Sequence, residues 1–430
     1  MSSQPPQALH SVSIYHGLPT FPPNIKGLSA IVAGANGISG DHMMRVLSES
    51  PQRWTNIYAL SRRPPVVDRK WETDVKHVSM DFLNSSPEEL ARQLKEGGVK
   101  ADYVFFFSYI QAPPKKGGGL WSDADAMVEK NVPLLSNLLQ ALKLSSITPK
   151  RIMLQTGAKH YGVHLGPTLA PQEESDPRIN LEQNFYYNQE DVLFKYCQET
   201  GSDWNVVMPA TILGAVKDAA MNAVFPIGVF AAVNAHLGKP MVFPGDITSY
   251  EMIQTASSAK MNAYIEEWAV LSGSGTANQR FNACDDSAFS WSRLWPALAK
   301  LYGVQHKGPD PNAKYTTNEL AYEPPRGFGP KGKINATYTL TQWAKQPEVQ
   351  ETWAKISKQH NLVQSPFENE SDIDRLFGFA DGFLLTSWPT MLSMDKCQKL
   401  GFHGYVNTFD SFRAVLEDFT ELKMLPPLPK

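Results

Sequence analysis

The chain has 430 residues, of which 42% are hydrophobic, so it is long and apolar enough for one large α/β domain and a smaller second part. It contains 40 lysines and arginines against 43 aspartates and glutamates, and this near balance argues against a nucleic acid as the main partner. The three cysteines (Cys197, Cys284 and Cys397) are odd in number and far apart. They indicate neither a disulfide framework nor a zinc site, and we expect no metal ion.

The first 26 residues are rich in serine, proline and glutamine, and we expect them to form a flexible lead-in. They lack the basic and then apolar pattern of a signal peptide. No run of 18 apolar residues occurs anywhere, so no membrane-spanning helix is expected. Together with the sparse cysteines, these features predict a cytoplasmic protein.

A glycine-rich turn follows the first apolar run, Leu28 to Ala33, which has the pattern of a buried strand. The turn leads into a segment with helical spacing, and such a strand–turn–helix unit is typical of the site that holds a dinucleotide pyrophosphate. We expect Gly34 to permit the turn, Gly37 to let phosphates approach the backbone, and Gly40 to let the helix pack close to the strand. The residues expected to bind the cofactor here are Gly34, Asn36, Gly37, Ile38 and Gly40.

The second predicted strand, residues 56–60, ends in Ser61-Arg62-Arg63-Pro64. An acidic residue at this point of a dinucleotide fold would bind the ribose hydroxyls of NADH, whereas arginines pair with the 2′-phosphate of NADPH. Two arginines without an acid therefore favour NADPH, with Ser61, Arg62 and Arg63 as binding residues. A solvated basic turn is the alternative explanation.

Further apolar runs predict strands at residues 75–78, 103–107, 151–155 and 203–214, the last range including a loop. Because helical patterns separate the strands, we expect an α/β fold with a Rossmann-type, doubly wound parallel sheet. The cofactor-binding domain is placed at residues 27–214, and later strands can join its sheet. Residues 215–430 are expected to form a smaller, mainly helical part that binds substrate.

The carboxyl ends of parallel strands meet at one edge of a sheet, where ligands bind in folds of this kind. Residues that follow the third to sixth strands are therefore expected to contact the cofactor. Asp81 can equally cap a helix, because Ser85 to Glu89 has the pattern of a helix start. The expected contacts are Asp81, Phe82, Ser108, Tyr109, Gln155, Thr211 and Ile212.

The second half of the chain has less specific patterns. Residues 219–237 are apolar and are interpreted as pocket-wall helices, although core packing explains Met221, Phe225 and Phe230 as readily. Amphipathic helices are predicted at residues 253–271 and 287–301. The polar, proline-containing region 307–364 indicates no specific function.

Four motifs together resemble the extended short-chain dehydrogenases/reductases, and within them the progesterone 5β-reductase/iridoid synthase-like group. They are the glycine triplet, the turn Ser61 to Pro64, the segment Thr156 to Tyr161 and the segment Asn184 to Asp191. The last two are the specific ones. The resemblance implies an NADPH-dependent enzyme that reduces an enone or enal by 1,4-addition.

The resemblance also implies the catalytic pair. Ordinary members of the superfamily carry a lysine four residues after the catalytic tyrosine, but here Glu190 stands four after Tyr186. Lys159, at the end of the fifth strand, is implied to replace that charge. A phenol that donates to the carbonyl oxygen stabilises the enolate that forms, and a nearby ammonium would add to this and lower the phenol pKa. Tyr186 and Lys159 are the candidate catalytic residues.

Two neighbours of this pair are assigned lesser roles. Tyr187 is a weaker candidate than Tyr186, because helical geometry turns it about 100° away. His160 is expected to be a structural hydrogen-bonding group.

Other functions stay open at this point. On the same fold, an NADPH-dependent ketone reductase or a non-redox isomerase or cyclase is an alternative. An alternative of another class is a protein that senses NADP(H) without catalysis, although retention of Tyr186 and Lys159 argues against it. The expected partner is a small apolar carbonyl substrate, with no nucleic acid and no membrane, and a homodimer is one option for the oligomeric state.

Overall fold

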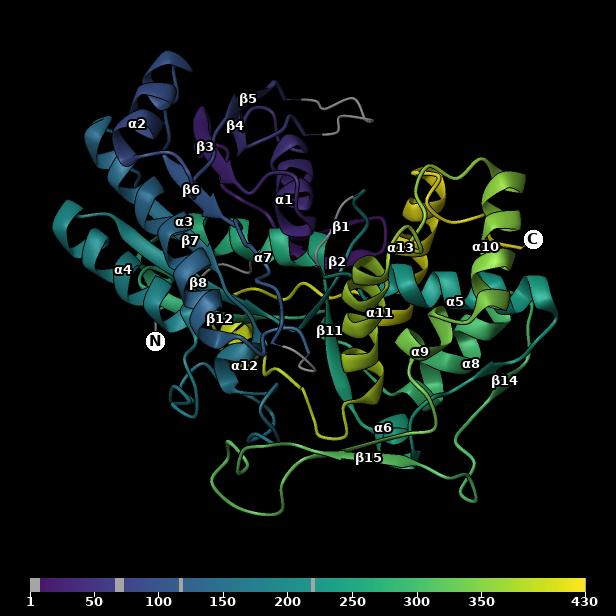
Figure 1. The fold of residues 1–430 in the computed structure, drawn as a ribbon. Coiled ribbons are helices and arrows are strands. Elements are labelled where there is room, and N and C mark those ends of the chain that lie inside the picture. Colours follow the sequence, from purple (N-terminus) through teal and green to yellow (C-terminus); the bar gives the residue numbers. More distant parts are fainter. Residues whose placement is uncertain (1–7, 66–72, 116–118, 218–220, 430) are drawn as a thin grey trace.

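The computed structural model describes residues 8–65, 73–115, 119–217 and 221–429. A seven-stranded sheet, parallel throughout, lies at the centre of the N-terminal part in the order β12-β8-β7-β6-β3-β4-β5 (Figure 1). The chain starts in the middle of the sheet, winds to one edge and then returns across β3 to the other, which confirms the doubly wound Rossmann fold. The strands are β3 (Leu28–Ala33), β4 (Trp54–Ser61), β5 (Val75–Ser79), β6 (Tyr103–Phe106), β7 (Arg151–Gln155), β8 (Asp203–Pro209) and β12 (Gln279–Ala283).

Helices cover both faces of this sheet (Figure 1). On one face α3 packs against both α2 and α4, and on the other α1 packs against α7. Leucines of α3 and the apolar residues of the central strands share one large core, as the apolar runs predict. The helices are α1 (Ile38–Ser48), α2 (Pro87–Glu96), α3 (Ala124–Leu144), α4 (Phe185–Thr200) and α7 (Ala259–Leu271).

The seventh strand, β12, comes from the second half of the chain and pairs in parallel with β8. Among the described strands β12 pairs with β8 alone, and a later segment covers its other side: the Lys396 ammonium donates to the Arg280 carbonyl, and the Cys397 thiol contacts the Asn282 carbonyl. Because Arg280 and Asn282 are polar, the segment is not an apolar run, and the sequence did not predict this strand although Phe281 is fully buried.

Two expectations about local structure are wrong. The predicted helix at residues 253–271 is instead strand β11 (Gln254–Ser258) followed by α7, and α7 is buried almost throughout because the sheet, α1 and the N-terminal segment surround it. The expected flexible lead-in is described from residue 8 onward and forms a hairpin, β1 (Leu9–Val12) and β2 (Tyr15–Pro19). Its Leu18 is buried and its Tyr15 hydroxyl bonds to Ser258 at 3.0 Å, so packing on α7 and β11 orders it.

The C-terminal half is mainly helical and has a second hydrophobic core, built around α5 (Figure 1). Phe225 and Phe230 of α5 lie in this core, so they are core residues and not pocket-wall residues. Ala219, the first residue of the predicted pocket-wall segment, lies outside the described residues. In the described ranges no helix has both the length and the apolar character needed to cross a bilayer. The helices here are α5 (Val224–Leu237), α6 (Ile247–Glu251), α8 (Trp291–Leu301), α9 (Leu340–Ala344), α10 (Pro347–His360), α11 (Glu370–Leu385), α12 (Asp395–Lys399) and α13 (Thr408–Glu421).

The remaining strands are short and form three small sheets, of which the one with β9 links the end of the first half to the second half. One small sheet joins β9, β11 and β13, a second pairs β10 with β14, and the hairpin β15–β16 belongs to a long excursion between α8 and α9. The predicted helix at residues 287–301 therefore begins only at Trp291, after β13. The bounds are β9 (Thr211–Leu213), β10 (Met241–Val242), β13 (Ala288–Phe289), β14 (His306–Lys307), β15 (Thr316–Glu319) and β16 (Lys333–Ala336).

Candidate functional site

A cavity of about 770 Å³ lies at the carboxyl ends of the central strands and continues between the two halves of the molecule. Of the seventeen residues proposed from the sequence, every one except Gly40 lines this cavity. Its cofactor end is formed by the loops after β3, β4, β5, β6, β7 and β8. The sequence-derived residues it brings together are Gly34, Asn36, Gly37, Ile38, Ser61, Arg62, Arg63, Asp81, Phe82, Ser108, Tyr109, Gln155, Lys159, Tyr186, Thr211 and Ile212.

The three glycines of the first turn differ in what they require. Gly34 has φ 84°, and a Cβ there would lie 2.7 Å from the Ser108 nitrogen, so the turn excludes other residues. A Cβ on Gly40 would lie 2.3 Å from the Gly34 oxygen, which explains why Gly40 packs beneath the turn and does not reach the cavity. A Cβ on Gly37 would meet only an ordinary 3.5 Å contact. Packing within the protein therefore does not require a glycine at position 37. The absence of a side chain there instead leaves space in the cavity next to the turn.

The cofactor end also presents polar groups that lack protein partners. Gly37 is the N-cap of α1 and provides no side-chain cap, so no side chain satisfies the first N–H groups of the helix, and Ile38 and Ser39 of its first turn line the cavity. Buried in the wall, Asn36 Oδ1, Gln155 Oε1 and Thr156 Oγ1 have no hydrogen-bond partner among the residues that the structure describes. Buried polar atoms are normally satisfied. These groups fit a ligand that carries phosphates and amides, as a nicotinamide dinucleotide does.

Several side chains shape the loop that carries the two arginines. Asn36 Nδ2 and Ser61 Oγ both donate to the Arg63 carbonyl, at 2.8 and 2.7 Å. Asp81 accepts from the backbone of Leu83 and from Asn84; although burial opposes it, these hydrogen bonds lower the Asp81 pKa. The cap of α2 is Ser86 rather than Asp81.

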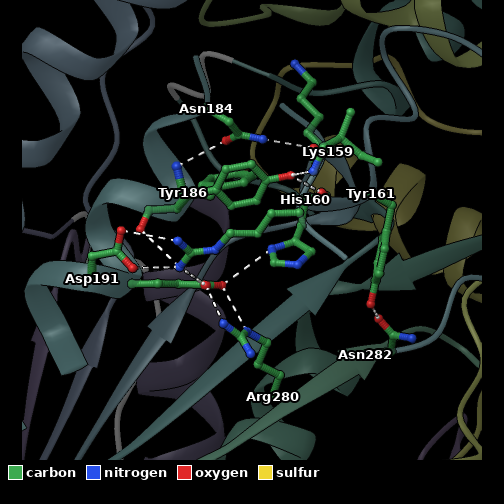
Figure 2. A network of polar contacts seen from close by, with 12 residues as sticks. Lys159, His160, Tyr161, Asn184, Tyr186, Asp191, Arg280 and Asn282 are labelled. Carbon is green, nitrogen blue, oxygen red and sulfur yellow. Dashed lines mark hydrogen bonds and ion pairs between the residues drawn. The ribbon is translucent and has the colours of Figure 1, made fainter. Parts of the chain in front are cut away.

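Tyr186 faces the cavity and Tyr187 does not. The Asn184 side chain caps α4 by accepting from the Tyr186 N–H and donating to the Lys159 carbonyl at 3.0 Å, which ties α4 to the segment after β7 (Figure 2). The Tyr187 hydroxyl donates to the His160 carbonyl and accepts from the Ile179 N–H. A Cβ on Gly157 would lie 3.2 Å from the Tyr186 hydroxyl, so that glycine lets the phenol reach the end of β7.

Glu190, which stands where the superfamily has its lysine, belongs to a buried ion-pair network. Its carboxylate contacts His160 Nδ1 at 3.4 Å, Arg178 at 2.8 Å and Arg280 at 2.7 Å (Figure 2). Burial alone would raise the Glu190 pKa, but the close contact with His160 and the hydrogen bonds from Arg280 and Arg178 lower it to about 2. Glu190 and His160 therefore hold α4, β12 and the segment after β7 together, and neither lines the cavity.

The Lys159 side chain extends away from the ion pairs around Arg280 (Figure 2). Its ammonium lies 3.7 Å from the centroid of the Trp121 ring, and that ring packs edge-to-face on Tyr186 with centroids 5.2 Å apart. The expected effect of Lys159 on the phenol is not found: burial raises the Tyr186 pKa, so the hydroxyl stays protonated. Burial likewise brings the Lys159 pKa well below its usual value.

Trp121 is a site residue that the sequence did not reveal. It is 5% exposed and has φ 73°, a conformation that costs a residue with a Cβ about 1–3 kcal/mol. Its indole N–H donates to the Tyr109 hydroxyl at 2.7 Å, and its ring contacts Phe185. The strained tryptophan therefore joins Tyr109, Phe185 and Tyr186 into one aromatic cluster at the cavity wall.

The opposite end of the cavity, where we expect the substrate, comes mostly from the second half of the chain, which the sequence assigned to substrate binding. One face of α11 lines it, with alternating small and aromatic residues. That helical spacing of glycine and phenylalanine was the signal that could have identified this wall. The lining residues at this end include Leu120, Met221, Leu320, Ile334, Arg375, Gly378, Phe379, Gly382, Phe383, Thr386 and Trp388.

Comparisons with known proteins agree with this architecture. A family model described as a PRISE-like Rossmann-fold domain matches residues 30–426. An uncharacterized protein of Schizosaccharomyces pombe is 30% identical over 93% of this chain and 99% of its own length. A 3-oxo-Δ4,5-steroid 5β-reductase of Arabidopsis thaliana is 27% identical over 92% of this chain and 93% of its own. An (S)-8-oxocitronellyl enol synthase of Catharanthus roseus is 26% identical over 92% of each chain.

Solved structures resemble the chain at lower identity. A dTDP-glucose 4,6-dehydratase of Streptomyces venezuelae, solved with NAD and TYD bound, aligns over 94% of this chain and 100% of its own with a TM-score of 0.55 and 15% identity. A putative epimerase from Burkholderia cenocepacia aligns over 92% of this chain and 99% of its own, with a TM-score of 0.55 and 13% identity. At such identities the likeness concerns the fold.

Proposed function

Because the chain belongs to the family of PRISE-like Rossmann-fold proteins, we propose that it is an NADPH-dependent reductase that adds hydride to the β-carbon of an apolar α,β-unsaturated carbonyl compound. The resemblance to the progesterone 5β-reductase/iridoid synthase-like group is confirmed, and the chain is an enzyme of the short-chain dehydrogenase/reductase type. The observation that carries the proposal is a protonated phenol, Tyr186, in the same cavity as the glycine turn and two arginines.

The choice of NADPH rests on the loop after β4. Arg62 and Arg63 both line the cofactor end, and no acidic side chain follows β4 directly. Guanidinium groups bind a phosphate in bidentate fashion, whereas the ribose hydroxyls of NADH are usually bound by an acidic side chain that accepts their hydrogen bonds. The open backbone at Gly37 and the uncapped start of α1 suit the pyrophosphate.

The residues around Tyr186 suit stabilisation of an oxyanion. When bound, NADPH supplies the hydride. The Tyr186 hydroxyl donates to the carbonyl oxygen of the substrate, where negative charge develops as the β-carbon is reduced. Because burial keeps this phenol protonated, it acts as a hydrogen-bond donor and not as a base. Lys159 lines the same cavity with Trp121 between it and the phenol, and when protonated it adds positive charge there.

The substrate end supports an apolar carbonyl compound. Phe379 and Phe383 of α11, with Trp388 and Met221, present mostly carbon to the cavity. The names of the plant relatives, a 3-oxo-steroid 5β-reductase and an 8-oxocitronellyl enol synthase, also concern carbonyl compounds with large apolar parts.

The test is turnover with product analysis. Purified full-length protein is incubated with NADPH, deuterated at the transferred position, and with 2-cyclohexen-1-one, trans-2-hexenal or a 3-oxo-Δ4 steroid. We expect consumption of NADPH and a saturated carbonyl product with deuterium at the β-carbon. An allylic alcohol would instead indicate a ketone reductase, and a rearranged product without NADPH consumption an isomerase or cyclase. Binding of NADPH without turnover of any substrate would leave a sensing protein and overturn the proposal.

A further inference from the structure

Gln254 is the first residue of β11, the middle strand of the small sheet β13-β11-β9, which lies between the main sheet and α11 (Figure 1). On one side of β11, Ala256 pairs with Thr211, which lines the cavity and is expected to contact the cofactor. On the other side, Gln254 pairs with Phe289 of β13, whose ring packs edge-to-face on Phe383 of α11. Gln254 therefore stands between the expected cofactor contacts and the apolar wall of the substrate end.

The side chain of Gln254 has an unused hydrogen-bond donor. The residue lines the cavity although it is only 2% exposed. Its Nε2 is buried and has no hydrogen-bond partner in the described part of the chain. A buried amide without a partner destabilises a protein, and native structures pair nearly all such groups. The partner of this amide is therefore expected to be a molecule bound in the cavity.

A second buried glutamine shows how a carboxamide is satisfied when it serves the fold. Gln172 is fully buried and does not line the cavity. Its Nε2 donates to Thr168 Oγ1 and to the Leu169 carbonyl, both at 2.8 Å, and its Oε1 accepts from the Met391 N–H at 2.8 Å. Gln172 thus joins two segments of the protein, whereas the Gln254 carboxamide keeps a donor at the cavity.

Other polar side chains of the substrate end have different partners. The Thr386 hydroxyl donates to the Gly382 carbonyl at 2.6 Å within α11, and the Arg375 guanidinium pairs with Asp372. The carboxamide of Gln254 differs from this guanidinium because it carries no charge and can both donate and accept. It therefore suits a hydroxyl or carbonyl oxygen better than an ionised group, whose burial would need an opposite charge.

We propose that Gln254 is a specificity-determining residue that binds a second oxygen of the substrate, apart from the carbonyl oxygen bound by Tyr186. This inference rests on the proposed function and deepens it: the substrate is an apolar enone or enal that also carries an uncharged hydroxyl or carbonyl group. The Nε2–H group donates to that oxygen, and a hydroxyl can donate to Oε1 in return. A compound without the second oxygen leaves the buried amide unpaired, so the site discriminates against it.

The test compares compounds that differ by one hydroxyl group. With NADPH, wild type and Gln254→Met are assayed on 2-cyclohexen-1-one against 4-hydroxy-2-cyclohexen-1-one, and on a 3-oxo-Δ4 steroid without further oxygen against its 17β-hydroxy counterpart. Methionine is unbranched like glutamine and fills similar space without the amide. In wild type we expect kcat/KM to be about 10-fold higher for the hydroxylated member of at least one pair, and in Q254M we expect this ratio to fall to about one or below. If Q254M fails to fold, Gln254→Leu provides the same comparison.

The matched control is Gln172→Met. It removes a carboxamide whose hydrogen bonds are all made within the protein, so Q172M should unfold at lower urea concentration than wild type and keep the wild-type ratio between the paired substrates. Q254M should unfold at the same or a higher urea concentration than wild type, since it removes an unpaired amide. An unchanged ratio in Q254M, or an equal change in Q172M, would overturn the inference.

Binding without turnover separates this inference from the proposed function and from a role in cofactor binding. Calorimetric titration measures the affinity for NADP⁺ and then, with NADP⁺ present, for cyclohexanone and 4-hydroxycyclohexanone. A preference for the hydroxylated ketone that disappears in Q254M, in a protein that reduces no enone, would support the oxygen subsite and overturn the proposed reduction. Reduction of both members of each pair with equal kcat/KM in wild type would support the proposed function and overturn the inference. Weaker NADP⁺ binding by Q254M with an unchanged substrate ratio would assign the amide to the cofactor and also overturn it.

Discussion

The two ends of the cavity are built in different ways. The cofactor end consists of short turns, each directly after one strand of the sheet, and its geometry follows from residues close together in sequence, such as Gly34 and Gly40. The substrate end is assembled from segments of the second half, including the face of α11, which approach only when the second core forms. One end therefore depends on backbone geometry and the other on tertiary packing.

The two ends of the cavity therefore tolerate different amino-acid substitutions. A Cβ on Gly34 would overlap the backbone of Phe107 and Ser108, which follow the neighbouring strand β6, whereas a Cβ on Gly382 of α11 would meet no described atom within 4 Å outside the helix's own backbone. The cofactor end is closely determined by sterics, while the substrate end has room in which side chains can vary. We expect variation at the substrate end to change which substrate fits without loss of the fold.

The largest effect is expected where the two ends meet, at Tyr186. Replacement by phenylalanine removes the hydrogen-bond donor but keeps the ring that packs on Trp121, so kcat should fall by about 100- to 1000-fold. NADPH binding, measured by fluorescence titration, should change little. The matched variant Tyr187→Phe loses bonds to His160 and Ile179 and should lower stability more than turnover. Full activity in Tyr186→Phe would remove the proposed mechanism.

The ion-pair network around Glu190 should affect the stability of the fold. Glu190→Gln leaves Arg178 and Arg280 without their shared carboxylate, and we expect unfolding in urea to become easier by about 3 kcal/mol at pH 7. Because the folded-state pKa of Glu190, about 2, is depressed, its contribution is present above the unfolded value of about 4.5 and is lost as pH falls toward 2. The difference from wild type should therefore shrink between pH 4.5 and pH 2. A gap independent of pH would contradict the ionic origin.

The cofactor end is tested by its two arginines. The double variant Arg62→Ala, Arg63→Ala should weaken NADPH binding by about 100-fold or more, since each charge-assisted hydrogen bond to phosphate contributes about 1.5–3 kcal/mol and about 1.4 kcal/mol corresponds to a factor of ten. NADH binding should change little, because NADH has no 2′-phosphate. Calorimetric titration with both cofactors measures the ratio. An equal loss for NADH and NADPH would mean that the arginines do not select the cofactor.

The smallest effects are expected from two glycine-to-alanine variants, one at each end of the cavity, which should each affect the binding of a different ligand. Gly37→Ala should remain folded within about 1 kcal/mol and weaken NADPH binding, because the added methyl group stands above the turn. Gly382→Ala should raise stability by up to about 1 kcal/mol, since alanine favours the helix, and should raise the KM for a bulky enone without a change in NADPH affinity. If both variants affected the same ligand, the division of the cavity would be wrong.

The strands of the main sheet up to β8 and the cofactor turns could be predicted because their signals are local. A buried parallel strand is a short apolar run, and a phosphate-binding turn needs glycine at particular places within one βα unit, such as Gly34. Tyr186 was found because its motif is short and specific. The hairpin of β1 and β2 and the strand β12 were missed because their polar residues are explained only by the surfaces they meet, such as the Ser258 hydroxyl that Tyr15 reaches.

Local sequence was thus sufficient for the fold class, for the dinucleotide turn with its arginines, and for a tyrosine at the edge of the sheet. Tertiary structure alone decided that Lys159 lies over Trp121, that Gln254 lines the cavity, and that α11 forms the substrate wall. The physical reason is the range of the forces involved. Turn geometry and strand burial act between neighbours in the chain, whereas the charge of a buried lysine and the shape of a cavity depend on groups that meet only after folding.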